Sequence, residues 1–358
     1  MRRYHHMNET IDLEPRQKAI LNFLAQNTQL SREQIAKRLV LVYPVSKATL
    51  SRDLSLLIRQ NLVTAMGKGP SCSYKTKSSH PLLKPIDLDQ YFAQEPDQRK
   101  EAKTSFEFGI FKNLTGIILP EEKERMSALF RSFSDTTKKL DPTLMQRELE
   151  RFMIELSWKS SKIEGNTYSL LETETLIKQN LEAPGKTKQE ATMILNHKDA
   201  FRVIVENRNE FKTLSLTTIM KLHNTLTKGL SITSGIRKHA VGITGTTYKP
   251  VDNEWQIKEA LEKLVLIVNK ADYPLEKALI IIGTLPYIQP FADGNKRTSR
   301  MLANAVLMAY DYFPLSYRSV DENEYKEALI LFYETINLYH IKRLFLDQYK
   351  FAVKTYFL

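Results

Sequence analysis

The sequence predicts a mainly α-helical protein: a helical bundle with a β-hairpin at its side, preceded by a small basic domain. Two observations support this prediction. From about Leu119 onward, apolar residues recur at the three- and four-residue spacing of amphipathic helices. Between Gly235 and Asp252, β-branched residues alternate around glycines instead, which is the pattern of a hairpin. We therefore expect a first domain at 1–78, a linker and arm at 79–118, and a main domain at 119–358.

The composition excludes several classes of protein. With 42% hydrophobic and 26% charged residues, the chain is typical of globular proteins. Its apolar runs are far too short for a membrane span, and no secretory signal is expected at its N-terminus. The single cysteine, Cys72, rules out an internal disulfide and fits a reducing compartment. The histidines show no zinc-ligand spacing. The sequence thus predicts a cytoplasmic protein without a membrane partner.

Three short helices and a hairpin are expected in the first domain. Apolar spacing predicts a helix at Arg16–Gln26, and Ser31 opens a capping box for a second helix. Ser46 caps a third helix at 46–61, after which "LVTAMGKGPSCSYK" predicts two short strands around a turn. Over about residues 12–76 this order resembles a winged helix-turn-helix domain, which implies DNA binding by the third helix and the hairpin.

The charge of this segment favours nucleic acid as its partner. Residues 1–80 contain thirteen Lys and Arg against five acidic residues, a local excess of +8 in a chain of net charge +11. A winged helix that serves protein contacts or dimerisation is the alternative. The polar residues that we expect at DNA are Lys47, Thr49, Ser51 and Arg52 on the third helix and Lys68 in the hairpin.

Helices fill almost the whole main domain. They are predicted at Glu121–Ser134, Leu144–Ser160, Leu170–Gln179, Lys188–Asn207, Leu216–Leu226, Asn253–Lys270, Pro274–Ile288, Gly294–Ala309, Glu322–Asn337 and His340–Tyr356.

One loop of the main domain combines a carboxylate, a glycine turn and cations. Pro290 cannot continue the preceding helix, and Asp293, Gly294 and Asn295 are turn residues before the next one. Backbone N–H groups at the start of that helix, with no side chain at Gly294, form an anion-binding nest. The loop therefore predicts a site for an anionic ligand.

The charged side chains around this nest suit a nucleotide. Arg297 and Arg300 are three residues apart, so both project from the same helix face, where two guanidinium groups suit a di- or triphosphate. Asp293 beside them is a candidate Mg²⁺ ligand, because Mg²⁺ prefers one carboxylate together with phosphate oxygens.

The loop "QPFADGNKRTSR" resembles the signature of the Fic family, His-Pro-Phe-x-Asp/Glu-Gly-Asn-Gly/Lys-Arg-x-x-Arg, at every position except the first. Four other stretches resemble Fic segments in the same order: "ILNHKDAFRVI", "KLHNTLTKGL", "SGIRKHAVGITGTTYKP" and "SVDENEYKEAL". The resemblance covers about residues 85–350. It implies a Fic-type helical bundle that transfers AMP from ATP, with Mg²⁺, to Ser, Thr or Tyr hydroxyls of a target protein.

The resemblance also implies which residues form the site. A nucleotide would be bound by Gly294, Asn295, Lys296, Arg297 and Arg300, with Asp293 at the metal. The hairpin would supply a flap with Gly242, Ile243, Thr244 and Gly245 at its turn.

A second motif lies upstream, at the end of the helix expected at about 144–166. Ser160, Glu164 and Gly165 fit the inhibitory pattern Ser/Thr-x-x-x-Glu-Gly/Asn of many Fic proteins, which implies that Glu164 pairs with Arg300. An arginine tied to a carboxylate is not free to orient a γ-phosphate, and breaking a buried pair on one side costs about 3–5 kcal/mol. The alternative is that Glu164 is an ordinary surface acid at a helix end.

The general base of the signature is missing. Gln289 stands where the family has histidine, and an amide cannot accept the hydroxyl proton. General-base catalysis is worth about 10²–10⁴-fold, so we expect impaired transfer with nucleotide binding retained. We do not expect His197, His223 or His239 to substitute. The chain is a natural pseudoenzyme, an enzyme of altered chemistry, or an altered form of a His-bearing parent.

Two functions of different classes therefore remain. The first is an adenylyltransferase scaffold of bacterial type, inhibited by Glu164 and impaired at Gln289. The second is a nucleotide-sensing, DNA-binding transcriptional regulator without transferase activity. A monomer and a homodimer are both compatible with the sequence.

Overall fold

A computed structural model describes residues 13–25, 27, 29–60, 62–67, 69–76, 80–138 and 141–356. The chain divides into two compact units, Met1–Ala93 and Gln94–Leu358. The predicted boundaries at 78 and 118 differ from this division, because the segment from residue 80 to Ala93 groups with the first unit.

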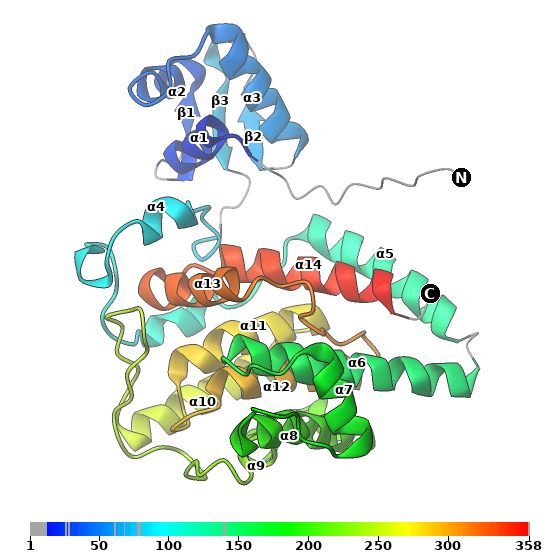
Figure 1. The fold of residues 1–358 in the computed structure, drawn as a ribbon. Helices are drawn as coiled ribbons and strands as arrows, with labels where there is room; N and C mark the ends of the chain where they lie inside the picture. Colours follow the sequence, from blue (N-terminus) through cyan, green and yellow to red (C-terminus); the bar gives the residue numbers. More distant parts are fainter. Residues whose placement is uncertain are drawn as a thin grey trace. The chain divides into compact units, whose positions relative to one another are not determined.

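The first unit contains helices beside a small sheet (Figure 1). In the sheet, β3 lies between β1 and β2 and is antiparallel to both. β2 and β3 are the two strands expected around the turn, whereas the two-residue β1 was not predicted. The elements are α1 (Pro15–Ala25), β1 (Leu30–Ser31), α2 (Arg32–Leu39), α3 (Lys47–Arg59), β2 (Val63–Met66), η1 (Gly69–Ser71), β3 (Ser73–Thr76) and α4 (Leu88–Phe92).

Capping and apolar periodicity explain the helices of this unit. The Ser31 capping box begins α2, and the Ser46 side chain accepts a hydrogen bond from the Thr49 backbone to begin α3. The apolar faces of α1, α2 and α3 then meet in one core that includes Ile20, Leu24, Ile35, Leu39, Leu50, Leu54 and Leu57.

The second unit confirms the prediction of a mainly α-helical protein. Every helix expected from residue 121 onward is present, with ends within a few residues of the predicted ones. The helices are α5 (Pro120–Thr137), α6 (Pro142–Ile163), α7 (Leu170–Gln179), α8 (Lys188–Glu206), α9 (Leu216–Thr227), α10 (Glu254–Lys270), α11 (Pro274–Ile288), α12 (Asn295–Ala309), α13 (Glu322–Thr335) and α14 (Tyr339–Thr355), with short 3₁₀ turns η2 (Pro96–Gln98), η3 (Phe108–Asn113) and η4 (Arg208–Phe211).

Helix α11 is the centre of this unit. All of its residues are buried, and it contacts α10, α12, α13 and α14 (Figure 1). The run "ALIIIGTLPYI" is apolar on every face, as a helix surrounded by other helices requires. The loop with the Fic-like signature follows directly from α11, so a rigid buried helix positions its first residue.

The predicted flap is an extended segment and not a regular hairpin. Residues 235–252 contain a turn at Thr244–Gly245, but no strand ladder joins the two arms. The segment is held from outside instead: Thr246 donates to the carboxylate of Glu334 on α13 at 2.5 Å, and Arg99 donates to both Gly245 O and Glu334 at 3.1 Å. These side-chain contacts take the place of the cross-strand hydrogen bonds that the alternating pattern predicted.

Among the described residues, no helix is both long and apolar enough to cross a membrane.

Candidate functional site

The loop between α11 and α12 has the turn geometry that its sequence predicts. Gln289 ends α11 in the left-handed region, with φ 50°, and its N–H still bonds to Leu285 O at 3.1 Å. Pro290 follows and prevents a further helical turn. Gly294, with φ 79°, then caps the start of α12. Two left-handed residues therefore reverse the chain, and α12 directs its free N–H groups toward the loop.

Gly294 cannot be replaced by a larger residue without strain. A Cβ atom there would lie 3.1 Å from Thr227 Cγ2, 3.3 Å from Arg297 Nη2 and 3.4 Å from His223 Cε1. Its positive φ adds to this crowding. Glycine at this position thus lets the backbone of the loop lie close to the Arg297 side chain, and it leaves the backbone N–H groups of the predicted anion nest uncovered.

Asn295 holds the loop together from inside. Its side-chain oxygen accepts from Phe291 N at 2.9 Å, and its Nδ2 donates to Phe291 O at 2.9 Å and to Gln289 Oε1 at 2.7 Å. The ring of His223 stacks on Phe291 with centroids 3.7 Å apart. Asn295 and His223 therefore shape the loop, and burial lowers the pKa of His223 to about 4, which keeps it neutral.

The two arginines of the loop have different partners. Arg297 Nη2 donates to Asp293 Oδ2 at 3.3 Å, while the Asp293 side chain remains 71% exposed. Arg300 is fully buried, and its guanidinium donates to Ser160 and Glu164 at the end of α6. Arg297 thus pairs with an exposed acid of the loop, whereas Arg300 is bound by residues at the end of α6.

Glu164 bridges two cations of the loop. Its Oε1 accepts from Arg300 Nη2 at 2.8 Å, and its Oε2 lies 3.0 Å from Lys296 Nζ. Burial alone would raise the pKa of Glu164, but Arg300 and Lys296 outweigh this effect and lower the pKa to about 2. The carboxylate is therefore ionised and paired on both oxygens.

Helix α6 ends in a way that places Glu164 at this point. Gly165 has φ 96°, and the hydrogen bonds Gly165 N to Lys162 O (2.9 Å) and Asn166 N to Ser161 O (3.1 Å) form a Schellman motif. The glycine of the upstream motif is thus needed to stop the helix, and Glu164 becomes its capping residue. The motif has a conformational as well as an electrostatic basis.

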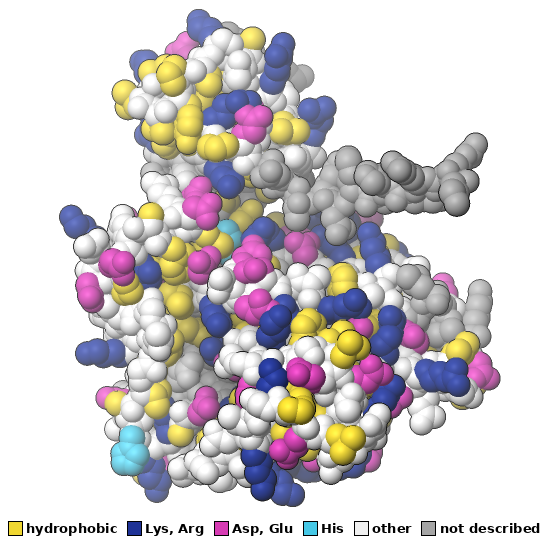
Figure 2. Space-filling model, viewed as in Figure 1, with side chains coloured by type: hydrophobic (Ala, Val, Ile, Leu, Met, Phe, Trp, Pro, Cys, Tyr) yellow, Lys and Arg dark blue, Asp and Glu magenta, His cyan; other side chains and the backbone are white. Residues whose placement is uncertain are grey.

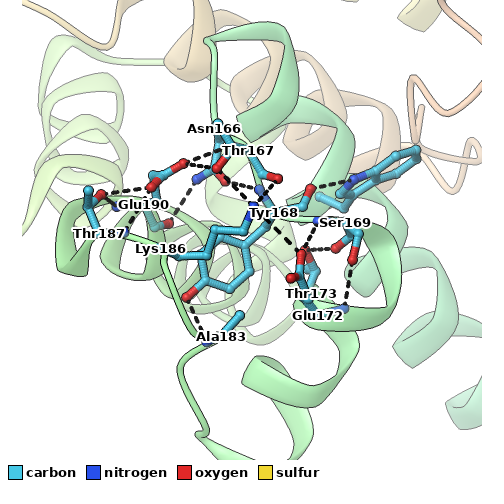
Figure 3. Close-up of polar contacts among 11 residues, drawn as sticks. Asn166, Thr167, Tyr168, Ser169, Glu172, Thr173, Ala183, Lys186, Thr187 and Glu190 are labelled. Atoms are coloured by element: carbon cyan, nitrogen blue, oxygen red, sulfur yellow. Dashed lines mark hydrogen bonds and ion pairs between the residues drawn. The ribbon is translucent and has the colours of Figure 1, made fainter.

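The segment after Glu164 is fastened to the start of α8. The Glu190 carboxylate accepts from the Thr167 backbone at 2.8 Å and from the Thr187 backbone at 2.9 Å (Figure 3). Asn166 donates to Glu190 O at 2.9 Å, and Lys186 donates to Thr167 O at 2.8 Å. These contacts limit the movement of Glu164, because the chain on its C-terminal side is tied to a second helix.

The match to known proteins covers the helices on both sides of this loop. A sequence model described as "Fic/DOC family" matches residues 213–307, which contain α9 to α11 and all but the last two residues of α12. The chain contains a Fic domain. The matched range includes the whole loop with Gln289, whereas the α6 motif lies outside it.

Curated relatives of the Fic domain are named as adenylyltransferases. The chain is 26% identical over 189 residues to "Protein adenylyltransferase Fic" of Nematostella vectensis, covering 52% of this chain and 44% of that protein. It is 29% identical over 204 residues to the protein of the same name of Aedes aegypti, covering 55% and 40%. The chain thus spans less than half the length of these relatives.

Solved structures show the same fold. Fic-1 (aa134–508) of C. elegans has a TM-score of 0.53 at 22% identity, covering 66% of this chain and 72% of that one. A Fic domain containing signaling protein of Bacteroides thetaiotaomicron has a TM-score of 0.51 at 19% identity, covering 65% and 95%. These likenesses support the fold of the second unit.

The structure brings most of the predicted Fic-site residues together. Asp293 to Arg300 lie in the loop and the first turns of α12, and Ser160 and Glu164 contact Arg300 directly. Gly242 to Gly245, the predicted flap turn, belong to the extended segment. Arg237, near the start of this segment, attaches it to the loop by donating a hydrogen bond to Gln289 O at 2.6 Å. The sequence analysis assigned no role to Arg237, because nothing in the residues around it indicates a contact with the loop.

The donor set around the loop fits an anionic ligand with a metal. Arg297 is buried, and its Nη1 has no hydrogen-bond partner among the described residues, so one donor of this side chain is not satisfied by the protein. Asp293 is exposed and carries the only carboxylate within the loop sequence. Over the described parts of the chain, no three His, Cys, Asp or Glu residues form a ready-made metal site. A metal here would depend on ligand oxygens.

The residues predicted to contact DNA lie in the first unit. Lys47, Ser51 and Arg52 are exposed on α3, whereas the Thr49 hydroxyl lies 3.0 Å from Ser46 Oγ at the helix start. Lys68 lies outside the described residues.

Proposed function

We propose that the Fic domain binds ATP at the α11–α12 loop and has the framework of a protein adenylyltransferase, inhibited by Glu164 and impaired at Gln289. The observation that supports this most is the bridge from Glu164 to Lys296 and Arg300. The Glu164 carboxylate occupies two cations of the signature, Lys296 and Arg300, that would otherwise be available to the phosphate oxygens of a ligand. Glu164 would thus compete with the nucleotide for the same donors.

The residues of the loop have separate tasks in this proposal. Gly294 and the N-terminal N–H groups of α12 would bind phosphate oxygens, and Arg297 would add its unpaired Nη1. Asp293 would hold Mg²⁺, which would neutralise charge on the phosphates. Asn295 acts indirectly, because its amide is used to keep the loop in shape.

Proton removal is the step that this chain does poorly. In AMP transfer, a target hydroxyl oxygen attacks the α-phosphorus, pyrophosphate leaves, and the hydroxyl proton must be accepted. Both ends of the Gln289 amide are already used: Oε1 accepts from Asn295, and Nε2 donates to Pro286 O at 2.8 Å. An amide also has no basic nitrogen. We therefore expect nucleotide binding with very slow transfer.

ATP affinity tests the proposed site. We expect Glu164→Gly to bind ATP–Mg²⁺ at least about tenfold more tightly than the unmodified chain, because an internal anion no longer occupies Lys296 and Arg300. Isothermal titration calorimetry of the full chain measures both affinities. Glu174→Gly, which removes an exposed carboxylate from α7, is the control and should leave the affinity unchanged. Equal affinities for Glu164→Gly and the unmodified chain would contradict competition at this site.

The exposed face of α3 favours DNA as a ligand of the first unit. Lys47, Arg52 and Arg59 are exposed there, and the one acid of the helix, Asp53, is buried. Asp53 accepts from Arg16 Nε at 2.7 Å and from Gln17 Nε2 at 2.8 Å. The face presented to solvent is therefore basic and mainly polar, with Ile58 as an exposed apolar residue near its C-terminal end, and its charged and polar groups suit phosphates and base edges. Figure 2 shows Lys and Arg side chains on the surface of this unit.

Replacing Lys47 and Arg52 with Ala should weaken binding to double-stranded DNA. For every phosphate that the protein no longer neutralises, the slope of log K against log salt should fall by about 0.9, because fewer counterions are released. Fluorescence anisotropy over a salt series measures this slope. Lys258→Ala combined with Lys263→Ala, which removes two positive charges from the surface of α10, is the control for the change in net charge. Unchanged DNA binding in the double variant would favour protein contacts as the role of this unit.

A nucleotide-sensing regulator is the second candidate function, and it would use both sites. It predicts a DNA affinity that shifts on addition of ATP, with no transfer in any variant. The presence of a basic helix face and an anion site in one chain supports keeping this alternative.

A further inference from the structure

We propose that Ser160 and His197 form a positioning chain that keeps Arg300 oriented for a phosphate after Glu164 has left. This inference rests on the proposed nucleotide site. It gives Ser160 a role opposite to that of Glu164, although both belong to the upstream motif: Glu164 blocks Arg300, and Ser160 aims it.

Arg300 is bound to α6 by three hydrogen bonds, of which only one involves Glu164. Its Nε donates to Ser160 Oγ at 3.0 Å, and its Nη2 donates to Ser160 O at 2.9 Å as well as to Glu164 Oε1 at 2.8 Å. The side chain also lies over the ring of Tyr325, with Cζ 5.6 Å from the ring centroid. Loss of the carboxylate therefore leaves the guanidinium plane held by Ser160 on one edge and by Tyr325 on one face.

The direction of each hydrogen bond in the chain follows from chemistry. His197 Nδ1 lies 2.8 Å from Met193 O, and a carbonyl can only accept, so Nδ1 carries the proton. The other nitrogen, Nε2, must then be the acceptor for Ser160 Oγ–H, at 2.9 Å. With its proton directed to His197, Ser160 Oγ presents a lone pair to the Nε–H of Arg300. Burial lowers the pKa of His197 to about 3, so the ring stays neutral and this direction is kept.

The chain is rigid and closed to solvent. Ser160 is 1% exposed, and His197 and Arg300 are 0% exposed. Each member comes from a different helix: α6, α8 and α12. A buried serine whose hydroxyl cannot rotate fixes the arginine rotamer, and a fixed donor binds a ligand without losing side-chain entropy. The unblocked Nη2–H then points to the place that the Glu164 oxygen had occupied.

The test is ATP binding in two backgrounds. With Glu164→Gly as the reference, we expect Ser160→Ala and His197→Leu each to weaken ATP–Mg²⁺ binding by about tenfold, the order expected for one hydrogen bond to a charged group. In the unmodified chain, the same changes should leave ATP binding unchanged or tighten it, because they also weaken the state in which Glu164 occupies Arg300. This reversal of sign distinguishes positioning from general destabilisation.

Further variants separate the chain from its surroundings. His197→Gln should retain most of the affinity of the Glu164→Gly reference, because its side-chain oxygen can accept from Ser160. Ser157→Ala is the matched control: it removes another buried hydroxyl of α6, one that donates to Met153 O at 2.7 Å and not to Arg300. Thermal unfolding of every variant verifies folding, and Ser160→Ala provides the measurement if His197→Leu does not fold.

Two results would overturn the inference in distinguishable ways. If Ser160→Ala in the Glu164→Gly background binds ATP as tightly as the reference or more tightly, Ser160 is purely inhibitory and only the positioning chain is wrong. If the Glu164→Gly reference itself binds no ATP, the proposed nucleotide site fails and the positioning chain fails with it.

Discussion

The combined variant Gln289→His and Glu164→Gly is expected to transfer label from ATP to a protein in a cell lysate, about 10²–10⁴-fold faster than Glu164→Gly alone. Histidine restores a group that can accept the hydroxyl proton, and loss of Glu164 frees Lys296 and Arg300 for phosphate. The backbone at this position suits the change, because Gln289 has φ 50° and histidine is among the residues enriched in the left-handed region.

The single variants provide the controls for this experiment. Gln289→His alone should remain nearly inactive, since Glu164 still occupies Arg300, and Glu164→Gly alone lacks the base. Label from ATP carrying its radioactive phosphorus at the α-position identifies AMP transfer. If the combined variant is no more active than Glu164→Gly, the missing base does not limit the chain, and the regulator alternative gains support.

The second large effect is on stability and depends on pH. The folded state lowers the pKa of Glu164 from 4.5 to about 2, although burial by itself would raise it, because Arg300 and Lys296 lie within contact distance. A lowered pKa means that the carboxylate contributes stability above the unfolded pKa and loses it as the pH falls through the folded pKa. The contribution is about 3 kcal/mol at pH 7 and disappears between about pH 5 and pH 2.

Urea unfolding of the unmodified chain and of Glu164→Gln at several pH values measures this contribution. The difference in unfolding free energy should be large at pH 7 and shrink steadily below about pH 5. Glu174→Gln, which changes an exposed carboxylate on α7, should give a small difference throughout. A difference for Glu164→Gln that stays constant down to pH 3 would show that the ion pair is not the source of the stability.

Much of the fold follows from local signals in the sequence. The Ser31 capping box and the Ser46 cap begin their helices as predicted, and the apolar run of α11 identifies the central helix. These features depend on residues within a few positions of one another, so a single sequence displays them. The hairpin at 235–252 is the exception, because alternation predicts extended chain but not the partner that will bond to it.

The candidate site divides in the same way. The sequence by itself predicted the turn at Gly294 and the cations of α12, because each is a property of adjacent residues. The absence of a base at Gln289 followed only from comparison with the Fic signature. The resemblance to Fic proteins added the pairing of Glu164 with Arg300, which spacing alone could not supply.

Only the tertiary structure decided which groups meet across the bundle. Three sets of contacts join residues far apart in the sequence. They are the ion pair of Glu164 with Lys296, the hydrogen bonds from Arg300 through Ser160 to His197, and the hydrogen bond from Arg237 to the loop. Hydrogen bonds and ion pairs act over a few ångströms, and the packing of α6 and α8 against α12 sets those distances. No periodicity in the sequence encodes that packing.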